Sequence, residues 1–513
     1  MENNFKNFIT HNKKHFKKTN IINNNDKILI EFNGWSSTHI WGSYLVNVLL
    51  NKYKCKILAY EGYTLISSDL SHTIYFKIKY FLAKKIFGKF FKIYKSFGID
   101  YFIRPKIDKY ILLKSKKKFK DLLKKIKNKK DVLNIKINNV LIGDLIYDTY
   151  LKNNKLATIN IKDKKFNFFF LESVKLFYYW QDYFKNNNIK SLIIVHPTYL
   201  YGIPMRIACN QDVPVYRATF NQITYISKKN YVMGEEFFSY PSYFKNIKTK
   251  LKIKAISESK KILENILLDK KEKKNNQTKL PKIVNNTKVS VLIAIHDFYD
   301  SPHVFGNMLF SDFYEWIKYL VNISKKTNYD WYIKPHPECS SHDLKLIKQI
   351  IKKNSKICIL PSKATHTEIL KKGVNTVLTC YGTVGYEYAY LGLTVVNASP
   401  NNPYRLYSFV HTPETIKKYE NIILNLKKFK LKPSKKKILE FFFVRRLYLV
   451  SNWLFIKRDN LSKNFGWNTE IYKPSMYKEW LNQWSQKKHK IININLKKFI
   501  NSKKNRFTSK DYD

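Results

Sequence analysis

The sequence predicts an α/β protein made of two doubly wound domains that face each other across a cleft, followed by C-terminal helices. Apolar segments of strand length alternate with segments of helix length in both halves of the chain. A polar, charged stretch broken by proline, residues 269–288, separates the two halves and is the expected linker. At 513 residues the chain is also too long for one ordinary core.

The first half, residues 1–268, opens as strand, turn, helix and strand. Lys27–Phe32 (KILIEF) is an apolar run of strand length, and the hydroxyls of the turn that follows suit the start of a helix over His39–Lys52. Residues 1–26 are expected to be a loose basic arm. The further elements expected here are a strand at Cys55–Tyr60, a helix near 170–186, a strand at Ser191–Val195, a helix at Gly202–Gln211 and a strand at Val213–Ala218.

Residues 72–130 interrupt this rhythm with a basic, aromatic segment that we expect to be helical. One interpretation is a lysine-rich surface helix. The other is a helix that rests on an anionic membrane surface, with phenylalanine and tyrosine at the interface and lysine beside them.

The second half restarts the alternation after the linker, over residues 289–430. Its expected strands are Val289–Ile295, Trp331–Ile333, Ile357–Leu360, Thr376–Thr379 and Thr394–Asn397, with a helix after each of the first four. Residues 431–513 are expected to form C-terminal helices and a basic tail whose last 28 residues fray. The apolar run Ile438–Ile456 is interrupted by Arg445 and Arg446, so it does not predict a membrane span.

The charge balance points to anionic partners. Lys and Arg number 94 against 38 Asp and Glu, a formal net charge of +56. Phosphates, acidic glycans and lipid headgroups fit such a chain; no nucleic-acid-binding module is visible, so no specific nucleic acid is expected. The N-terminus has no apolar core and the five cysteines are scattered, which predicts a cytoplasmic protein, at most peripheral on the inner face of the plasma membrane.

Two motifs in the second half suggest phosphate chemistry. Lys334-Pro335-His336-Pro337 follows a strand end, and its prolines fix a loop that presents Lys334 and His336 to an anion. Gly382-Thr383-Val384 lies where a strand turns into a helix, so the backbone at Gly382 can approach a phosphate and Thr383 can cap the helix. Glu387, four residues on, lies on the same helix face and can accept from ribose hydroxyls.

The pairing of a His-Pro loop with a Thr-Val-Gly-x-Glu helix resembles bacterial capsule and surface-polysaccharide glycosyltransferases of the GT-B fold, a group that includes Kdo and sialic acid transferases. The resemblance covers residues 289–412 and implies that His336, Gly382 and Thr383 hold the donor phosphate. It also implies a base-contacting loop that ends at His366. Arg405 follows another strand end and could reach an anionic donor. The family commonly has Ser-Ser-Thr or Ser-Thr at the turn, where this chain has Tyr381-Gly382-Thr383.

The resemblance implies a nucleotide-sugar co-substrate, no cofactor, and an oligosaccharide or lipid-linked acceptor bound by the first half. An inverting transfer needs a base, and three alternatives follow strands or begin helices: His196, Asp144 (with Asp148 one turn on) and Glu61. The only D-x-D is Asp511–Asp513 in the tail, and no HExxH spacing occurs, so no catalytic metal is expected.

Other functions remain open on the same residues. A sugar-nucleotide 2-epimerase or a glycerophosphate transferase could use this fold, although Cys380-Tyr381-Gly382 departs from the Tyr-Ser-Ser turn typical of the latter. A different class is a non-catalytic basic scaffold that binds membrane or polyanion. Nucleotide binding would discriminate against the scaffold, and salt-sensitive binding to anionic vesicles alone would favour it.

Overall fold

The fold is described from a computed structural model. It describes residues 2–16, 23–61, 88–99, 101–103, 105–219, 222–232, 237–268, 287–306, 308–352, 356–449, 453–454, 473–502 and 504–507. Residues 72–87 of the predicted basic insertion, 269–286 of the predicted linker and the tail motif Asp511–Asp513 lie outside these ranges.

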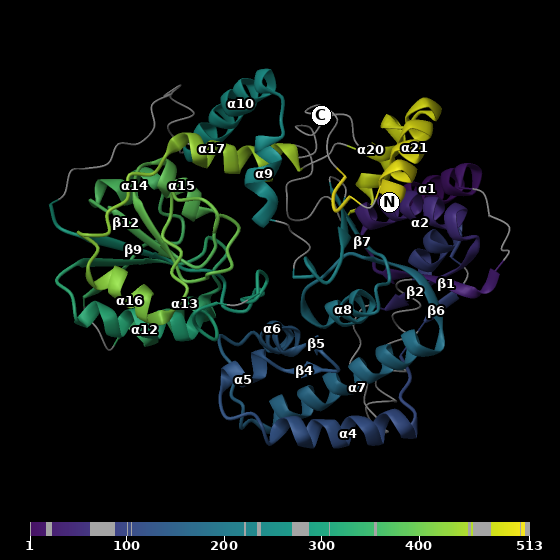
Figure 1. Cartoon of the computed structure of the whole chain (residues 1–513), viewed down its shortest axis with the longest axis horizontal. Coiled ribbons are helices and arrows are strands. Elements are labelled where there is room, and N and C mark those ends of the chain that lie inside the picture. The colour runs from purple at the N-terminus through teal and green to yellow at the C-terminus, as the bar shows by residue number, and fades with distance from the viewer. Residues whose placement is uncertain are drawn as a thin grey trace. The chain divides into compact units, whose positions relative to one another are not determined.

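The chain divides into two compact units (Figure 1). The N-terminal unit comprises residues 1–146, 161–235 and 449–510, and the C-terminal unit comprises residues 147–160, 236–448 and 511–513. The division differs from the predicted domains in two ways. Residues 147–160 of the first half belong to the C-terminal unit, and residues 449–510 after the second sheet belong to the N-terminal unit.

The N-terminal unit contains a six-stranded sheet in the order β3-β2-β1-β6-β7-β8. All its neighbouring strands are parallel except β7 and β8, which are antiparallel. The strands are β1 (Asn23–Phe32), β2 (Cys55–Glu61), β3 (Tyr101–Ile103), β6 (Asn188–Ile194), β7 (Val215–Thr219) and β8 (Gln222–Ile226). The chain order therefore reverses between β1 and β6, which is the switch point of a Rossmann-like sheet.

Helices cover both faces of this sheet. Ile28 and Ile30 of β1 pack in a core with α2 (Ser36–Tyr53), while Tyr60 of β2 points to the opposite face, where its ring lies 5.0 Å from that of Trp180 in α7. Further helices of this unit include α4 (Lys109–Leu123), α5 (Lys129–Leu133), α7 (Lys164–Asn186), α8 (Gly202–Asn210) and a helix at residues 88–96. The alternation of side chains along each strand produces these two layers.

Two predictions about the chain ends were wrong. The expected loose arm contains α1 (Glu2–His15), and its Phe8 is fully buried. The expected frayed tail contains α21 (Gln486–Ser502), which together with α20 (Ser475–Gln483) packs on α2, and Leu496 is fully buried. Apolar residues at helical spacing within these basic segments supply the buried faces.

The predicted helical insertion is also more varied than expected. Between residues 88 and 130 the chain forms helix 88–96, the edge strand β3 and the helices α4 and α5. Farther on, a small hairpin of β4 (Lys136–Ile137) and β5 (Val140–Leu141) leads into α6 (Gly143–Asn154), the helix within which the chain changes units.

The C-terminal unit contains a five-stranded, wholly parallel sheet in the order β11-β10-β9-β12-β13. Its strands are β9 (Ser290–Ala294), β10 (Asp330–Lys334), β11 (Ile357–Ile359), β12 (Thr376–Thr379) and β13 (Thr394–Asn397), close to the predicted segments. The order reverses between β9 and β12. This second sheet is therefore also Rossmann-like.

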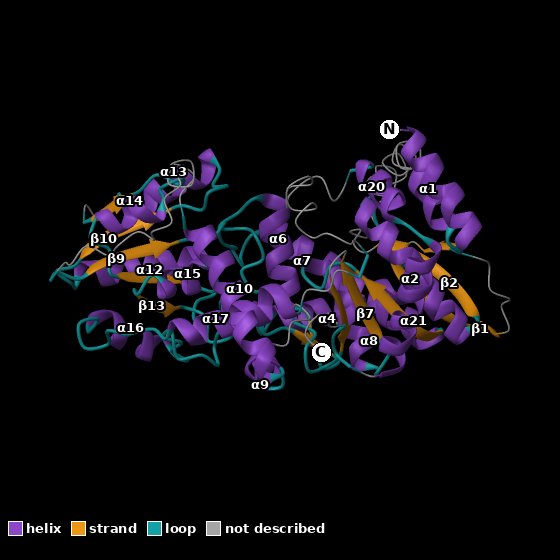
Figure 2. Ribbon diagram, turned by 90° about the horizontal axis from the view of Figure 1, so that it is seen from above, coloured by secondary structure: helices purple, strands orange, loops and turns teal. Residues whose placement is uncertain are grey.

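Helices flank the strands of this second sheet (Figure 2). They are α12 (Phe313–Lys325), α13 (Ser341–Ile351), α14 (His366–Lys371), α15 (Val384–Tyr390) and α16 (Ile416–Leu424). The unit also contains α9 (Tyr240–Lys245), α10 (Thr249–Leu267) and α17 (Lys435–Phe443), which continues into a π-helical turn, Val444–Tyr448. Within the described ranges, no helix combines the length and apolar character that crossing a bilayer requires.

Candidate functional site

A cavity of about 540 Å³ opens at the carboxyl ends of β9, β10 and β12 in the C-terminal unit. Ligands of doubly wound sheets bind at this edge, next to the switch point. Seven of the eight predicted nucleotide-binding residues line the cavity: Lys334, His336, His366, Gly382, Thr383, Val384 and Glu387. The tertiary structure thus gathers residues that are up to 53 positions apart in the sequence.

A hydrogen bond within its own loop favours one tautomer of the neutral His336 ring. Pro335 ends β10, and the backbone N–H of Glu338 donates to Nδ1 of His336 at 3.2 Å. Because Nδ1 accepts this hydrogen bond, a neutral His336 ring carries its proton on Nε2. The loop therefore provides an N–H donor of the kind that a phosphate oxygen accepts.

Lys334 supplies positive charge beside this donor. Its side chain is half-buried at the end of β10, and burial lowers its pKa from the ordinary value, while the nearby carboxylate of Glu387 acts in the opposite direction. An anion entering the cavity would stabilise the charged form of Lys334 further.

The turn after β12 is tightly packed at Gly382. A Cβ on Gly382 would lie 3.1 Å from Cε1 of His296 and 3.3 Å from Oγ1 of Thr379. The next glycine, Gly385, leaves space for Tyr404, whose hydroxyl donates to the carbonyl of Gly382 at 2.7 Å. Tyr404 therefore holds the turn through this hydrogen bond, while Gly382 lines the cavity.

Thr383 does not cap helix α15, contrary to the prediction. Its backbone is helical and its side chain makes no capping hydrogen bond. The side chain instead hydrogen-bonds Glu387, one turn on, and this bond partly offsets the effect of burial, which raises the pKa of Glu387. Nε2 of His366 lies 3.8 Å from the same carboxylate. Thr383, His366 and Glu387 therefore form one polar wall.

The cavity also contains residues that the sequence analysis missed. His296 follows β9, stacks on Phe313 with ring centroids 4.8 Å apart, and lies 3.3 Å from Oγ1 of Thr379. Its burial lowers its pKa to about 3, so it is neutral at physiological pH. A polar residue directly after an apolar strand, the signal used for His196, could have found it.

Arg445 is the second missed residue, and it lines the cavity that Arg405 was expected to reach. Arg445 comes from the π-helical turn after α17 and lines the cavity. Arg405 is exposed, donates to Asn401 at 2.8 Å and does not line the cavity. Arg445 and Arg446 lie side by side within an apolar run, and this could have indicated a site, because burying a charge that has no partner costs free energy.

The N-terminal unit presents a different pair at its own switch point. Glu31 of β1 is almost fully buried, and its Oε2 accepts from the backbone N–H groups of Val195 and His196 at 2.7 and 3.2 Å. Its Oε1 lies 3.2 Å from Nδ1 of His196, while the imidazole is 29% exposed. The ring packs edge-on against Trp35. A buried carboxylate thus orients a partly exposed imidazole.

The other base candidates have different surroundings. Both carboxylate oxygens of Asp144 accept from Arg206, at 2.6 and 2.7 Å, in a buried bidentate ion pair, which favours a structural role. Asp148 contacts Nδ1 of His303 at 2.6 Å in the C-terminal unit. Glu61 is half-buried at the end of β2, beside Phe32 in the strand register. Within the described ranges, no three His, Cys, Asp or Glu side chains gather as metal ligands would.

Comparison with known proteins gives structural similarities only. No family model and no curated protein sequence matches this chain. A UDP-GlcNAc 2-epimerase from Neisseria meningitidis is 11% identical with a TM-score of 0.25, over 82% of this chain and 98% of that one. Thermosulfurimonas dismutans KpsC, a β-Kdo 2,7 transferase, is 13% identical with a TM-score of 0.30, over 52% and 79%. Acinetobacter baumannii MurG is 8% identical with a TM-score of 0.20, over 92% and 99%.

Proposed function

We propose that this protein is a glycosyltransferase that transfers a sugar from a nucleotide-sugar donor to a growing cell-surface polysaccharide. The observation that carries the proposal is the convergence of Lys334, His336 and Arg445 on one cavity at the switch point of a parallel sheet. This set of groups suits the phosphate of a leaving nucleotide, on which negative charge develops as the glycosidic bond breaks.

Each group has a distinct role in the proposal. His336 donates through Nε2–H to a phosphate oxygen, while Lys334 and Arg445 balance its charge. The narrow turn at Gly382 lets the backbone approach the same phosphate. Glu387 and His366 contact the nucleoside, with Glu387 accepting from ribose hydroxyls.

The proposed base is His196, positioned by Glu31. The backbone and side-chain contacts of Glu31 fix the imidazole, so its exposed edge is held ready to accept a proton from an acceptor hydroxyl. Asp144 is not part of the proposal because Arg206 occupies both of its oxygens. Glu61 remains an alternative base.

The test is a thermal-shift titration with CMP, CDP, UDP and GDP on the wild type, His336→Ala and a control variant, His342→Ala. His342 is exposed on α13 and does not line the cavity. A ligand at 100 times its Kd stabilises a protein by about 2.7 kcal/mol. We expect one nucleotide to stabilise the wild type and the control, and His336→Ala to lose the effect.

The outcome also separates reactions. The corresponding sugar nucleotide should release free nucleotide in the presence of enzyme and acceptor, whereas an epimerase would return an isomer of the donor. A folded protein that responds to none of the four nucleotides would contradict the transferase proposal.

A further inference from the structure

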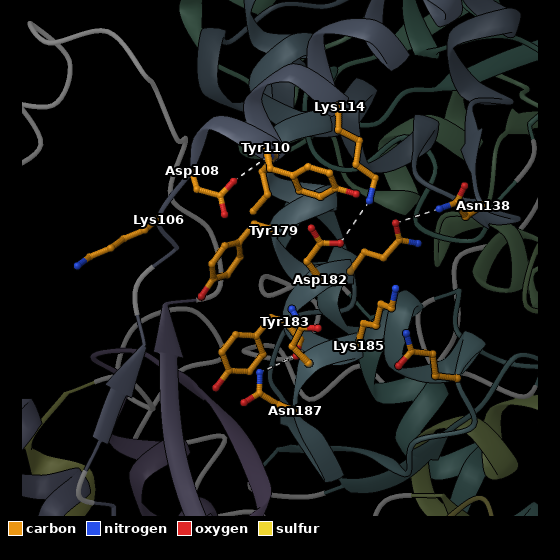
Figure 3. Close-up of a pocket in the computed structure, with 14 residues that line it drawn as sticks. Lys106, Asp108, Tyr110, Lys114, Asn138, Tyr179, Asp182, Tyr183, Lys185 and Asn187 are labelled. Carbon is orange, nitrogen blue, oxygen red and sulfur yellow. Dashed lines mark hydrogen bonds and ion pairs between the residues drawn. The ribbon is translucent and has the colours of Figure 1, made fainter.

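A second pocket lies in the N-terminal unit, away from the strand ends considered so far. Its volume is about 720 Å³, and it is formed by the start of α4, the end of α7 and the residue after α8 (Figure 3). Asn186 and Asn187 of its lining directly precede β6, so the pocket lies at the amino edge of the sheet. The Glu31–His196 pair lies at the opposite, carboxyl edge. The volume is in the range of roughly 300–1,000 Å³ that small-ligand sites occupy.

The lining combines aromatic rings with amide side chains. Figure 3 shows the rings of Tyr179 and Tyr183 on one side of the pocket and the ring of Tyr110 beside Lys114. Such rings offer flat apolar faces with a polar hydroxyl at one end. The amide groups come from Asn138, Gln181, Asn186, Asn187 and Gln211. Flat apolar faces beside paired donors and acceptors match the two sides of a sugar ring, one carrying C–H groups and the other hydroxyls.

The charged groups are mixed, which discriminates between ligands. Lys106, Lys114 and Lys185 line the pocket together with Asp108 and Asp182. Asp182 is 3.4 Å from Lys114, and Asp108 caps α4 through the N–H of Ile111. The two carboxylates would repel a dense polyphosphate, but they accept readily from hydroxyl groups. The lysines favour a ligand that also carries some negative charge.

Several of these groups are available for a ligand. Among the residues that the structure describes, the side chains of Lys185, Asn186 and Gln211 and the hydroxyls of Tyr179 and Tyr183 make no hydrogen bond or ion pair. Others are already oriented, since Asn138 donates to Gln181 at 2.9 Å. The pocket therefore has both positioned and unused polar groups.

We propose that this pocket binds a short oligosaccharide carrying carboxylate groups. Such a site would hold a segment of an acidic glycan at the amino edge of the sheet, away from the Glu31–His196 pair at the carboxyl edge. It does not depend on the C-terminal unit being a sugar transferase, because recognition needs only the residues of α4, α7 and their neighbouring loops.

Calorimetric titration with a galacturonic acid tetramer tests the proposal, with maltotetraose as the uncharged comparison. Because aromatic side chains are enriched among the residues that carry most of the binding energy, we expect about tenfold weaker binding of the acidic tetramer to Tyr110→Ala and to Tyr183→Ala. Tyr110 is 64% exposed, so its removal should leave the fold intact. Lys185→Ala should also weaken binding, whereas Lys117→Ala, an equal charge loss at an exposed position on α4 outside the pocket, should not.

Two results would overturn the proposal. One is no binding of the acidic tetramer to the folded wild type. The other is equal binding to wild type and all variants with a steep salt dependence, which would assign the affinity to the overall charge of +56. The nucleotide titration is a separate readout, so Tyr110→Ala should keep its nucleotide response, and failure of one proposal leaves the other standing.

Discussion

The two sheets of this protein share one strand order around their switch points but present different chemistry there. In the N-terminal unit the strands on either side of the switch point, β1 and β6, bring Glu31 and His196 within hydrogen-bonding distance. In the C-terminal unit the equivalent strands, β9 and β12, lead to His296 and the Gly382 turn in a cavity lined by cationic groups. One edge holds a carboxylate–imidazole pair, and the other is suited to an anion.

The difference shows that topology decides where a site forms, while a few side chains decide what it does. Parallel strands leave their carboxyl ends together at one edge in both units. At β1 a buried carboxylate orients the imidazole ring of His196. After β10 and β12 the prolines and glycines shape the backbone that lines the cavity.

The largest effect should come from His196→Ala. Removal of a general base typically costs about 10²–10⁴-fold in rate. We expect kcat for nucleotide release with acceptor present to fall by this amount, while nucleotide affinity at the C-terminal cavity stays unchanged. His342→Ala is the matched control. A variant with unaltered kcat would remove His196 from the proposal and favour Glu61.

Glu31→Gln should follow, with a loss of about 10²-fold, the size expected when a reacting group is misplaced by about 1 Å. The introduced amide oxygen could still accept from the backbone N–H groups of Val195 and His196, but the NH₂ group would then face Nδ1 of His196 where the second carboxylate oxygen was. Steady-state kinetics should show a lower kcat with little change in the donor KM. If Glu31→Gln instead reduces nucleotide affinity, the proposal that the N-terminal edge acts in proton transfer and the C-terminal edge in nucleotide binding is wrong.

Gly385→Ala should damage the C-terminal edge alone. The added Cβ would lie 2.7 Å from Cζ of Tyr404 and closer still to its hydroxyl, which holds the Gly382 turn. Overpacking of this kind costs about 1–3 kcal/mol. Urea unfolding followed by circular dichroism should show lower stability, with weaker nucleotide binding. Gly88→Ala is the control, because its Cβ would meet no atom within 4 Å.

The smallest effect concerns a buried histidine in each unit. Burial lowers the pKa of His39 to about 4 and that of His296 to about 3. Because each folded pKa is below the unfolded value near 6.5, the unfolded state binds more protons, and stability falls as the pH drops from 6.5 towards 4 and 3 respectively. The full stability is present above pH 6.5.

The free energy of unfolding should therefore fall less between pH 7 and pH 5 when either histidine is replaced by glutamine, by about 1–2 kcal/mol. Thermal unfolding at a series of pH values measures this change. His296→Gln should also weaken nucleotide binding, because its ring packs against the Gly382 turn, whereas His39→Gln should not. If both variants lose as much stability between pH 7 and pH 5 as the wild type does, the buried histidines are not the cause of that loss.

The sequence allowed the strands of both sheets to be predicted to within a few residues, except β3 and β8, because apolar runs of strand length are local signals. It also drew attention to Lys334 and His336 in the loop after a strand, and to Thr383 and Glu387 where a glycine turn leads into a helix. It did not identify the packing of α1 and α21. Their basic composition concealed the apolar spacing that buries Phe8 and Leu496.

What the sequence by itself determined is therefore the alternation of strands and helices and the loops that line the C-terminal cavity, both of which are encoded within a few consecutive residues. Only the tertiary structure decided which partners these loops have. It brought Glu31 to His196, 165 positions away, placed Arg445 rather than Arg405 at the cavity, and committed Asp144 to Arg206. Such pairings depend on strand order and on the path of the chain between the two units, which no local pattern specifies.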